Sequence, residues 1–203
     1  MKIDRIIFAT GNEGKMKEVR MILEDLEIEV LSLKEAGIAA AVEENGSTFE
    51  ENAVLKATEI MKRSGGIVLA DDSGLEVDAL NKEPGIHSAR YMGYDTSYHI
   101  KNQNIINRLK GKNGAERSAR FVCAIAAALP DGRVLVTKGT MEGEIGYEER
   151  GENGFGYDPI FYLPEYGCYS GELPLEIKNS LSHRGKALQL MKDELQKLKE
   201  EAS

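Results

Sequence analysis

The chain lacks an excess of basic residues and any long apolar run, and each absence excludes a class of protein. Its 203 residues carry 26 Lys and Arg against 34 Asp and Glu, which gives a formal net charge of −8. A protein that coats the nucleic-acid backbone needs a broad basic face, so we expect no nucleic-acid partner. The longest apolar run, residues 121–129, is too short to cross a bilayer, so we expect no membrane partner either.

Cysteines are also few. Cys123 lies in an apolar stretch and Cys168 in a Gly/Tyr/Ser loop, without metal-ligand spacing, and we interpret them as a reduced core thiol and a reduced loop thiol. Asp4 and Arg5 interrupt what would have to be the apolar core of a signal peptide, so we expect a cytoplasmic protein. A chain of this length fits one domain, residues 1–203, with two lobes around a shared sheet.

Strand and helix patterns alternate along the chain, which predicts an α/β fold. The expected strands are 6–9, 28–33, 67–70, 118–129 and 133–145, and the expected helices are about 16–26, 49–63, 97–109 and a last one with Leu188, Met191, Leu195 and Leu198 on one face. Thr48 and Glu51 have capping-box spacing at the start of the second helix. Pro130-Asp131-Gly132 indicates a hairpin between the two long strands. We therefore expect a mixed sheet, parallel in its first half and antiparallel in its second.

The most informative segment is the loop Thr10-Gly11-Asn12-Glu13-Gly14-Lys15, between the first strand and the first helix. Backbone N–H groups at a helix start have no intrahelical partner and lie at the positive end of the helix dipole, so they attract anions. Glycines let the backbone come close, and Lys15 adds a mobile positive charge. The loop lacks the glycine spacing and the hydroxyl of a Walker loop, so any metal must be held elsewhere. A tight turn with a solvated lysine explains the local sequence equally well.

Asp71 and Asp72 follow the apolar strand 67–70, which we expect to end there. Consecutive residues of extended backbone point to opposite faces, so we expect one of the two to face a ligand. Carboxylates at such a strand end hold Mg²⁺ or orient a water, as hydrolysis of a phosphoric anhydride requires. The alternative is that Asp-Asp-Ser-Gly only forms an Asx turn.

Three charged residues between these two segments can be explained as ordinary solvent-exposed charges. The local sequence alone favours Glu43 and Glu44 as solvated charges in a loop. Lys56 shares a helix face with Asn52, four residues earlier, and becomes a second phosphate ligand if that face points to the substrate. A surface lysine is the alternative.

Two later segments suggest recognition of a base. Residues 151–161 combine glycines, which permit close approach, with aromatic rings that stack on a flat base, although a glycine-bulged strand with core aromatics fits as well. Ser182 looks like a helix N-cap, yet His183 and Arg184 then place cations where the helix dipole disfavours them. This local conflict indicates that His183 and Arg184 serve a ligand.

Six motifs follow one another over nearly the whole chain. They are Thr10-Gly11-Asn12-x-x-Lys15, Glu50-Glu51-Asn52-Ala53 with Lys56-Ala57, Ala70-Asp71-Asp72-Ser73-Gly74-Leu75, Pro84-Gly85-Ile86-x-Ser88-Ala89-Arg90-Tyr91, Gly154-Phe155-Gly156-Tyr157-Asp158-Pro159 and Ser182-His183-Arg184-Gly185. Together they resemble the motifs of the inosine triphosphate pyrophosphatase family, most closely its bacterial and archaeal branch, the dITP/XTP pyrophosphatases. Residues 166–173 depart from the family's more regular pattern and lie away from these motifs.

This resemblance implies two lobes around a long mixed β-sheet with flanking helices, a central substrate cleft and a homodimer. It also implies Mg²⁺-dependent hydrolysis of deaminated purine nucleoside triphosphates (ITP, dITP and XTP) to the monophosphate and pyrophosphate. By motif, Asp72 would be the catalytic proton acceptor and, with Glu43, a metal ligand; the choice between Glu43 and Glu44 stays open. The residues that would bind substrate are Thr10, Gly11, Asn12, Glu13, Gly14, Lys15, Lys56, Ser73, Phe155, Gly156, Tyr157, Asp158, Lys178, His183 and Arg184.

Two other classes remain open on the residues alone. A nucleotide-binding sensor would use the same loop but has no need for Asp71 and Asp72 beside a second acidic site. A phosphatase that forms an aspartyl-phosphate normally needs a D-x-D arrangement, which Asp71-Asp72-Ser73 lacks.

Overall fold

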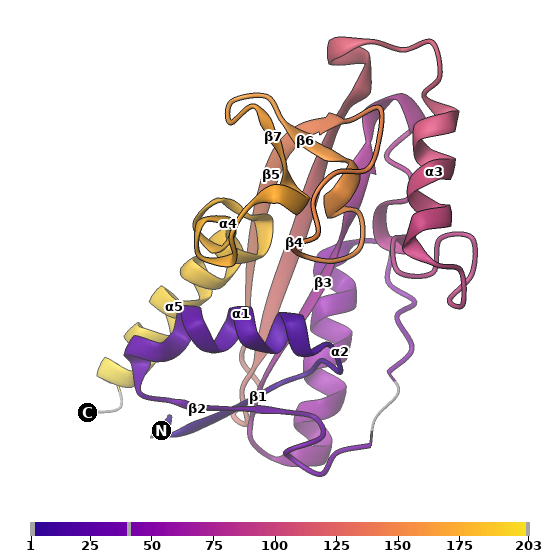
Figure 1. Cartoon of the computed structure of the whole chain (residues 1–203). Helices are drawn as coiled ribbons and strands as arrows, with labels where there is room; N and C mark the ends of the chain where they lie inside the picture. The colour runs from indigo at the N-terminus through magenta and orange to yellow at the C-terminus, as the bar shows by residue number, and fades with distance from the viewer. Residues whose placement is uncertain (1–2, 40–41, 202–203) are drawn as a thin grey trace. The chain divides into compact units, whose positions relative to one another are not determined.

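The computed structural model describes residues 3–39 and 42–201 and contains a seven-stranded sheet with the order β2-β1-β3-β4-β5-β6-β7 (Figure 1). The strands are β1 Arg5–Phe8, β2 Glu29–Ser32, β3 Ile67–Val77, β4 Ser118–Ala128, β5 Val134–Ile145, β6 Phe161–Leu163 and β7 Cys168–Tyr169. β1 pairs in parallel with β2 and β3, whereas β6 pairs antiparallel with β5 and β7. The predicted α/β class and mixed sheet are confirmed.

The helices are α1 Glu13–Leu23, α2 Phe49–Ser64, α3 Tyr98–Arg108, α4 Leu175–Leu181 and α5 His183–Glu201. The sequence predicts all of these except α4, although α1 begins at Glu13 instead of near Met16 and ends at Leu23, and the sequence also misses β6 and β7. These three elements have only seven, three and two residues, too few to show a periodic apolar pattern. None of the helices in the described part of the chain is long and apolar enough to cross a membrane.

Side-chain caps start both α1 and α2, of which the sequence analysis anticipates the one at Thr48. The Asn12 carboxamide accepts the N–H of Lys15 at 3.0 Å, and the Thr48 hydroxyl accepts the N–H of Glu51 at 3.1 Å. The Glu51 carboxylate accepts from the backbone N–H and hydroxyl of Ser47 at 2.6 and 2.7 Å, and a backbone hydrogen bond from Thr48 also lowers its pKa. Such caps satisfy N–H groups that the helix leaves open.

The chain divides into two compact units. Unit 1 comprises residues 1–72, 123–139 and 183–203, and unit 2 comprises residues 73–122 and 140–182, so β3, β4 and β5 each contribute to both. That the units form a single domain stays a prediction.

Each unit has its own apolar core. In unit 1, α1 lies against α5 (Figure 1), and the four residues predicted for one face of the last helix are buried there. In unit 2, the core gathers Leu75, Ile105 and Ile160 around Phe121 and Phe161, whose ring centroids lie 4.4 Å apart. Each fully buried side chain of this size contributes about 1.5 to 3 kcal/mol relative to exposure.

The strand β3 does not end at residue 70, as the sequence analysis predicts, but continues to Val77 with Asp71 and Asp72 inside it. The prediction is wrong because Leu75 and Val77 are fully buried and carry the apolar pattern on past the two carboxylates. The Asx turn is wrong for the same reason. The shorter β1 leaves the sheet here: its register ends at Phe8 opposite Leu69, so the loop that follows β1 emerges close to Asp71.

Candidate active site

The loop between β1 and α1 is braced by its own side chains. The buried Thr10 hydroxyl accepts the N–H of Asn12 at 3.1 Å, while residues 11–14 are exposed. A Cβ added at Gly11 would meet nothing within 4 Å, so packing does not require the glycine. The exposed first turn of α1 therefore presents N–H groups to an anion at the positive end of the helix.

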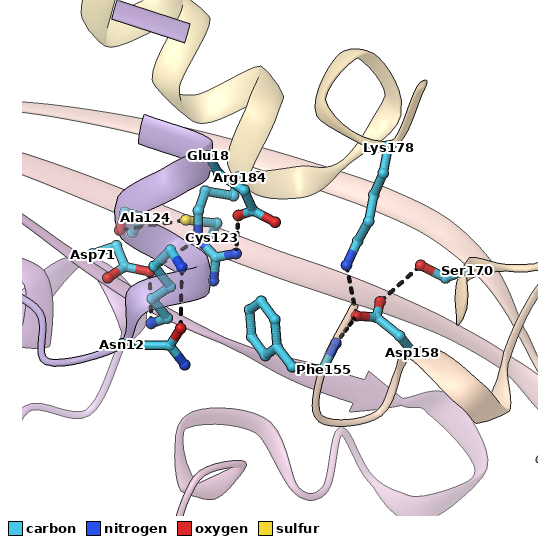
Figure 2. A network of polar contacts seen from close by, with 11 residues as sticks. Asn12, Glu18, Asp71, Cys123, Ala124, Phe155, Asp158, Ser170, Lys178 and Arg184 are labelled. Carbon is cyan, nitrogen blue, oxygen red and sulfur yellow. Dashed lines mark hydrogen bonds and ion pairs between the residues drawn. The ribbon is translucent and has the colours of Figure 1, made fainter. Parts of the chain in front are cut away.

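Asp71 is a buried anion surrounded by cations from three helices. Its Oδ2 accepts from Lys15 Nζ at 2.8 Å and lies 3.3 Å from Nε of Arg184. Figure 2 labels Asp71, Arg184 and Glu18. Arg184 Nη1 donates in turn to Glu18 at 2.7 Å. Burial alone would raise the pKa of Asp71, but the charges of Lys15, Arg184 and Lys56 lower it well below its usual range. Asp71 is therefore ionised and holds Lys15 and Arg184 in place.

Asp72, the next residue along β3, has the opposite electrostatics. Its Oδ2 accepts from Asn52 Nδ2 at 2.9 Å, and Asn52 Oδ1 accepts the N–H of Gly46 at 2.8 Å, which fixes the orientation of the amide. Burial raises the pKa of Asp72 to about 6; the bond from Asn52 opposes this rise, and the nearby negative charges of Glu44 and Asp71 add to it. A carboxyl group that titrates close to neutrality suits a general base.

Glu44, rather than Glu43, lies among these charges. Glu43 is exposed, whereas the Glu44 carboxylate forms an ion pair with Lys56. Lys56 Nζ also donates to the backbone oxygen of Asp71 at 3.0 Å. Burial would lower the pKa of Lys56, but Asp71 and Glu44 raise it above its usual value, so the ammonium stays charged. The metal role of Glu43 stays a prediction, with Glu44 the better placed of the two.

This region of unit 1 carries more negative than positive side chains. The carboxylates are Glu18, Glu44, Asp71 and Asp72, and the cations paired with them are Lys15, Lys56 and Arg184. Asp71 Oδ1 is buried and has no hydrogen-bond partner among the described residues. Among the described residues this leaves a net negative charge, which one more cation would neutralise.

The donor set decides which cation fits. Within residues 3–39 and 42–201, no cluster of three or more His, Cys, Asp or Glu side chains is arranged to hold a metal. Mg²⁺ is usually bound by one or two carboxylates, several waters and substrate phosphates. The pair Asp72 and Glu44 fits such an ion, and it does not fit a metal that needs a complete set of protein ligands.

The first turn of α5 is fixed by close contact with β5. A Cβ at Gly139 would lie 2.2 Å from the carbonyl oxygen of His183 and 2.7 Å from the nitrogen of Ala187. The Thr137 hydroxyl donates to the carbonyl of Ala187 at 2.8 Å. Glycine at position 139 is therefore what allows the buried His183 and Arg184 to pack this close to the strand.

A second buried carboxylate, Asp158, organises a loop of unit 2. Asp158 Oδ2 accepts from Lys178 Nζ at 2.6 Å and from the N–H of Phe155 at 2.8 Å, and its Oδ1 accepts from the Ser170 hydroxyl at 2.7 Å (Figure 2). The Lys178 ammonium lies 5.2 Å from the centroid of the Phe155 ring, which is 37% exposed. Gly154 has φ +80°, and a Cβ there would lie 2.3 Å from Asp158 Oδ2. The structure thus brings together three of the residues predicted to bind the base.

Tyr157 and Gly156 of the same loop are placed differently. The Tyr157 hydroxyl donates to the Ser88 carbonyl at 2.7 Å, and its buried ring packs edge-on against Tyr98 at 5.2 Å. The Gly156 carbonyl accepts from Asn102 at 3.3 Å. Tyr157 therefore behaves as a core aromatic and Phe155 as an exposed one. The interpretation of this segment as core aromatics fits Tyr157, and the interpretation as a stacking surface for a base fits Phe155. Their roles, and that of the half-buried Ser73 in β3, stay predictions.

Two residues of the unit 1 cluster, Glu18 and Asn52, were not predicted as site residues. Glu18 lies three residues after Lys15, so both fall on one side of α1, a spacing that could have identified it. Asn52 was placed on the helix face of Lys56 but was given no role. The two cysteines are free thiols, and burial raises the pKa of Cys123 to about 12, which makes it a poor nucleophile.

Comparisons with known proteins identify the family of the chain. The model of the Ham1 family matches residues 6–194. A dITP/XTP pyrophosphatase from Exiguobacterium sp. is 48% identical over 191 residues, covering 94% of this chain and 96% of that protein. Another dITP/XTP pyrophosphatase, from Clostridium perfringens, is 46% identical over 197 residues, covering 94% of this chain and 97% of that protein.

Solved structures give the same result. A HAM1 protein from Coxiella burnetii superposes with a TM-score of 0.87 at 41% identity, covering 97% of this chain and 100% of that one. The Staphylococcus aureus Ham1 protein superposes with a TM-score of 0.85 at 44% identity, covering 95% and 98% of the two chains. With a family match over most of its length and relatives this similar, the chain belongs to the Ham1 family.

Proposed function

We propose that this protein is a nucleoside-triphosphate pyrophosphatase that hydrolyses ITP, dITP and XTP to the monophosphate and pyrophosphate, and so removes deaminated purines from the nucleotide pool. The observation that carries this proposal is the buried Asp72, which has a pKa of about 6 and lies near the charge of Glu44. The preceding residue of the same strand, Asp71, binds Lys15 through its side chain and Lys56 through its backbone oxygen. Relatives with 46 to 48% identity are named dITP/XTP pyrophosphatases.

The triphosphate is bound by the loop that starts α1. N–H groups of Gly11, Glu13 and Gly14 meet phosphate oxygens, and Lys15 and Lys56 neutralise the charge that develops as the anhydride bond breaks. Both lysines are only about a fifth exposed, so their charges act in a poorly solvated environment. Asp72 orients the attacking water and accepts its proton.

Mg²⁺ is the proposed cofactor, held by Asp72 and Glu44, with Glu43 as the alternative second ligand. When bound, it supplies Lewis-acid polarisation of the phosphoryl oxygens. The surplus of negative side chains here and the two-carboxylate donor set support this assignment.

Base selection follows from hydrogen bonding. Donors aimed at a 6-keto oxygen accept hypoxanthine and xanthine, whereas the 6-amino group of adenine leaves such donors unpaired at a cost of about 1 to 3 kcal/mol each. In unit 2, the proposed donor is Lys178 and the proposed stacking surface is Phe155. The base-binding roles of His183 and Arg184 are proposals from the family motifs alone.

We also propose a cytoplasmic homodimer that binds neither nucleic acid nor membrane. The net charge of −8 supports the absence of a nucleic-acid partner. Gel filtration with light scattering tests the dimer.

The function is tested with purified protein, Mg²⁺ and, separately, ITP, dITP, XTP, GTP and ATP, while pyrophosphate, orthophosphate and monophosphate are quantified. We expect pyrophosphate from the first three and little from GTP or ATP. A parallel series with EDTA should abolish turnover. Orthophosphate as the sole product would show that a different bond is cut, and no turnover of any purine triphosphate would favour a sensor.

A further inference from the structure

Lys56 makes an ion pair with a carboxylate that the proposed function needs for metal. Its ammonium, on α2, contacts the Glu44 carboxylate and donates to the backbone oxygen of Asp71 at 3.0 Å. The two side chains are only 18% and 26% exposed, so water screens the pair weakly. Glu44 is thus already neutralised by a cation that belongs to the protein.

A divalent ion and an ammonium compete for such a carboxylate. Both prefer the same oxygen lone pairs, and two cations held by one weakly solvated carboxylate repel each other. The second contact of Lys56, to the Asp71 carbonyl, does not depend on Glu44. The ammonium can therefore leave Glu44 and stay anchored at the strand.

We propose that Lys56 is a placeholder cation, which neutralises Glu44 in the metal-free protein and is displaced from it when a divalent ion binds. Displacement turns the ammonium into a free positive charge beside the incoming metal and its phosphates. Metal and triphosphate binding are thereby coupled through one side chain. The proposal rests on the proposed function, because it takes Glu44 as a metal ligand.

Lys15 provides a matched comparison. Its side chain is 19% exposed, close to the value for Lys56, but its ammonium contacts Asp71 at 2.8 Å and not Glu44. Asp71 and Asp72 point to opposite sides of β3. Removing the charge of Lys15 therefore changes the net charge of the region equally and leaves the placeholder in position.

The experiment measures Mn²⁺ binding to nucleotide-free protein, by calorimetry and by electron paramagnetic resonance of the free ion. Lys56→Met keeps the apolar stem and removes the charge. We expect it to bind Mn²⁺ about tenfold more tightly than the unmodified chain. Lys15→Met should change the affinity by about twofold or less, and Lys56→Arg should leave it close to the original value. Thermal unfolding of each variant checks that it is folded.

A double-mutant cycle isolates the pair. In a Glu44→Gln background the ion pair no longer exists, because the carboxamide is neutral, so Lys56→Met should give no further gain in Mn²⁺ affinity. The proposal is overturned if Lys56→Met fails to tighten Mn²⁺ binding, if Lys15→Met tightens it equally, or if neither the unmodified chain nor Lys56→Met binds Mn²⁺.

Turnover of ITP by the unmodified chain separates this inference from the proposed function. If ITP is not hydrolysed but Lys56→Met still tightens Mn²⁺ binding, the placeholder role of Lys56 is supported and the proposed function is refuted. If ITP is hydrolysed and the unmodified chain and Lys56→Met bind Mn²⁺ with the same affinity, the proposed function is supported and the placeholder role of Lys56 is refuted.

Discussion

Unit 1 and unit 2 each bury a carboxylate that is bound to a lysine, but only one of these clusters is balanced. In unit 2, Asp158 uses both oxygens: Lys178 neutralises it, and Ser170 and the Phe155 N–H add hydrogen bonds. In unit 1, four carboxylates meet three cations, and Asp71 Oδ1 has no partner among the described residues. The Asp158 cluster fixes its loop through hydrogen bonds within the protein, whereas the unit 1 cluster keeps a net negative charge that a bound cation would neutralise.

The same contrast recurs within two consecutive residues. Cations on one side of β3 lower the pKa of Asp71, while burial and Glu44 on the other side raise that of Asp72. The alternation of side chains along a strand is enough to separate an anchoring carboxylate from a reactive one. Sequence position alone does not distinguish their roles, but their partners do.

The largest effect is expected for Asp72→Asn. The amide is nearly the same size and cannot accept the proton of the attacking water, so we expect turnover of ITP to fall by about 10³-fold or more. Binding of a non-hydrolysable triphosphate should remain measurable by calorimetry. Unchanged turnover would refute the assigned role.

The balanced cluster is tested by Asp158→Asn. This change leaves Lys178 buried with no negative partner, which we expect to destabilise the protein by about 3 to 5 kcal/mol in urea unfolding. Asp158→Asn with Lys178→Met removes both charges and should recover part of that loss. A single variant as stable as the original would mean that the pair does not hold the loop.

The two neighbouring aspartates should have opposite effects on stability in the presence of EDTA. The folded pKa of Asp72, about 6, lies above the unfolded value of about 3.9, so its ionised form destabilises the folded protein as pH rises through this window. Asp72→Asn should therefore stabilise at mildly alkaline pH by about 2 to 3 kcal/mol, with no gain below about pH 4.

Asp71 behaves in the reverse sense, because its pKa is lowered in the folded state. Its stabilisation is present above the unfolded pKa and is lost as the pH falls. Asp71→Asn should therefore destabilise at mildly alkaline pH, and the difference should shrink in acid. Urea unfolding across pH checks both variants, and equal signs at alkaline pH would contradict the contrast.

Features that depend on contacts between residues close in the sequence could be predicted, whereas features that depend on contacts between distant residues could not. The loop after β1 was predictable because Asn12 and Lys15 act within three residues of each other. The partners of Asp71 were not predictable, because the cations that stabilise its carboxylate lie 56 and 113 residues away. The choice between the adjacent Glu43 and Glu44 likewise depends on a contact with α2 that no local pattern reveals.

The smallest effect concerns the loop between β1 and α1. Lys15→Ala removes a charge that we expect to contact the phosphates and not the base. The variant should therefore weaken binding of ITP, XTP and GTP alike, by about tenfold. The variant also removes one cation from Asp71, yet Arg184 still pairs with that carboxylate and limits the loss of stability. Competition with a fluorescent nucleotide measures all three affinities in one format. A loss confined to one base would contradict the assignment and would mean that Lys15 acts through the geometry of Asp71 and Arg184 instead of through the triphosphate.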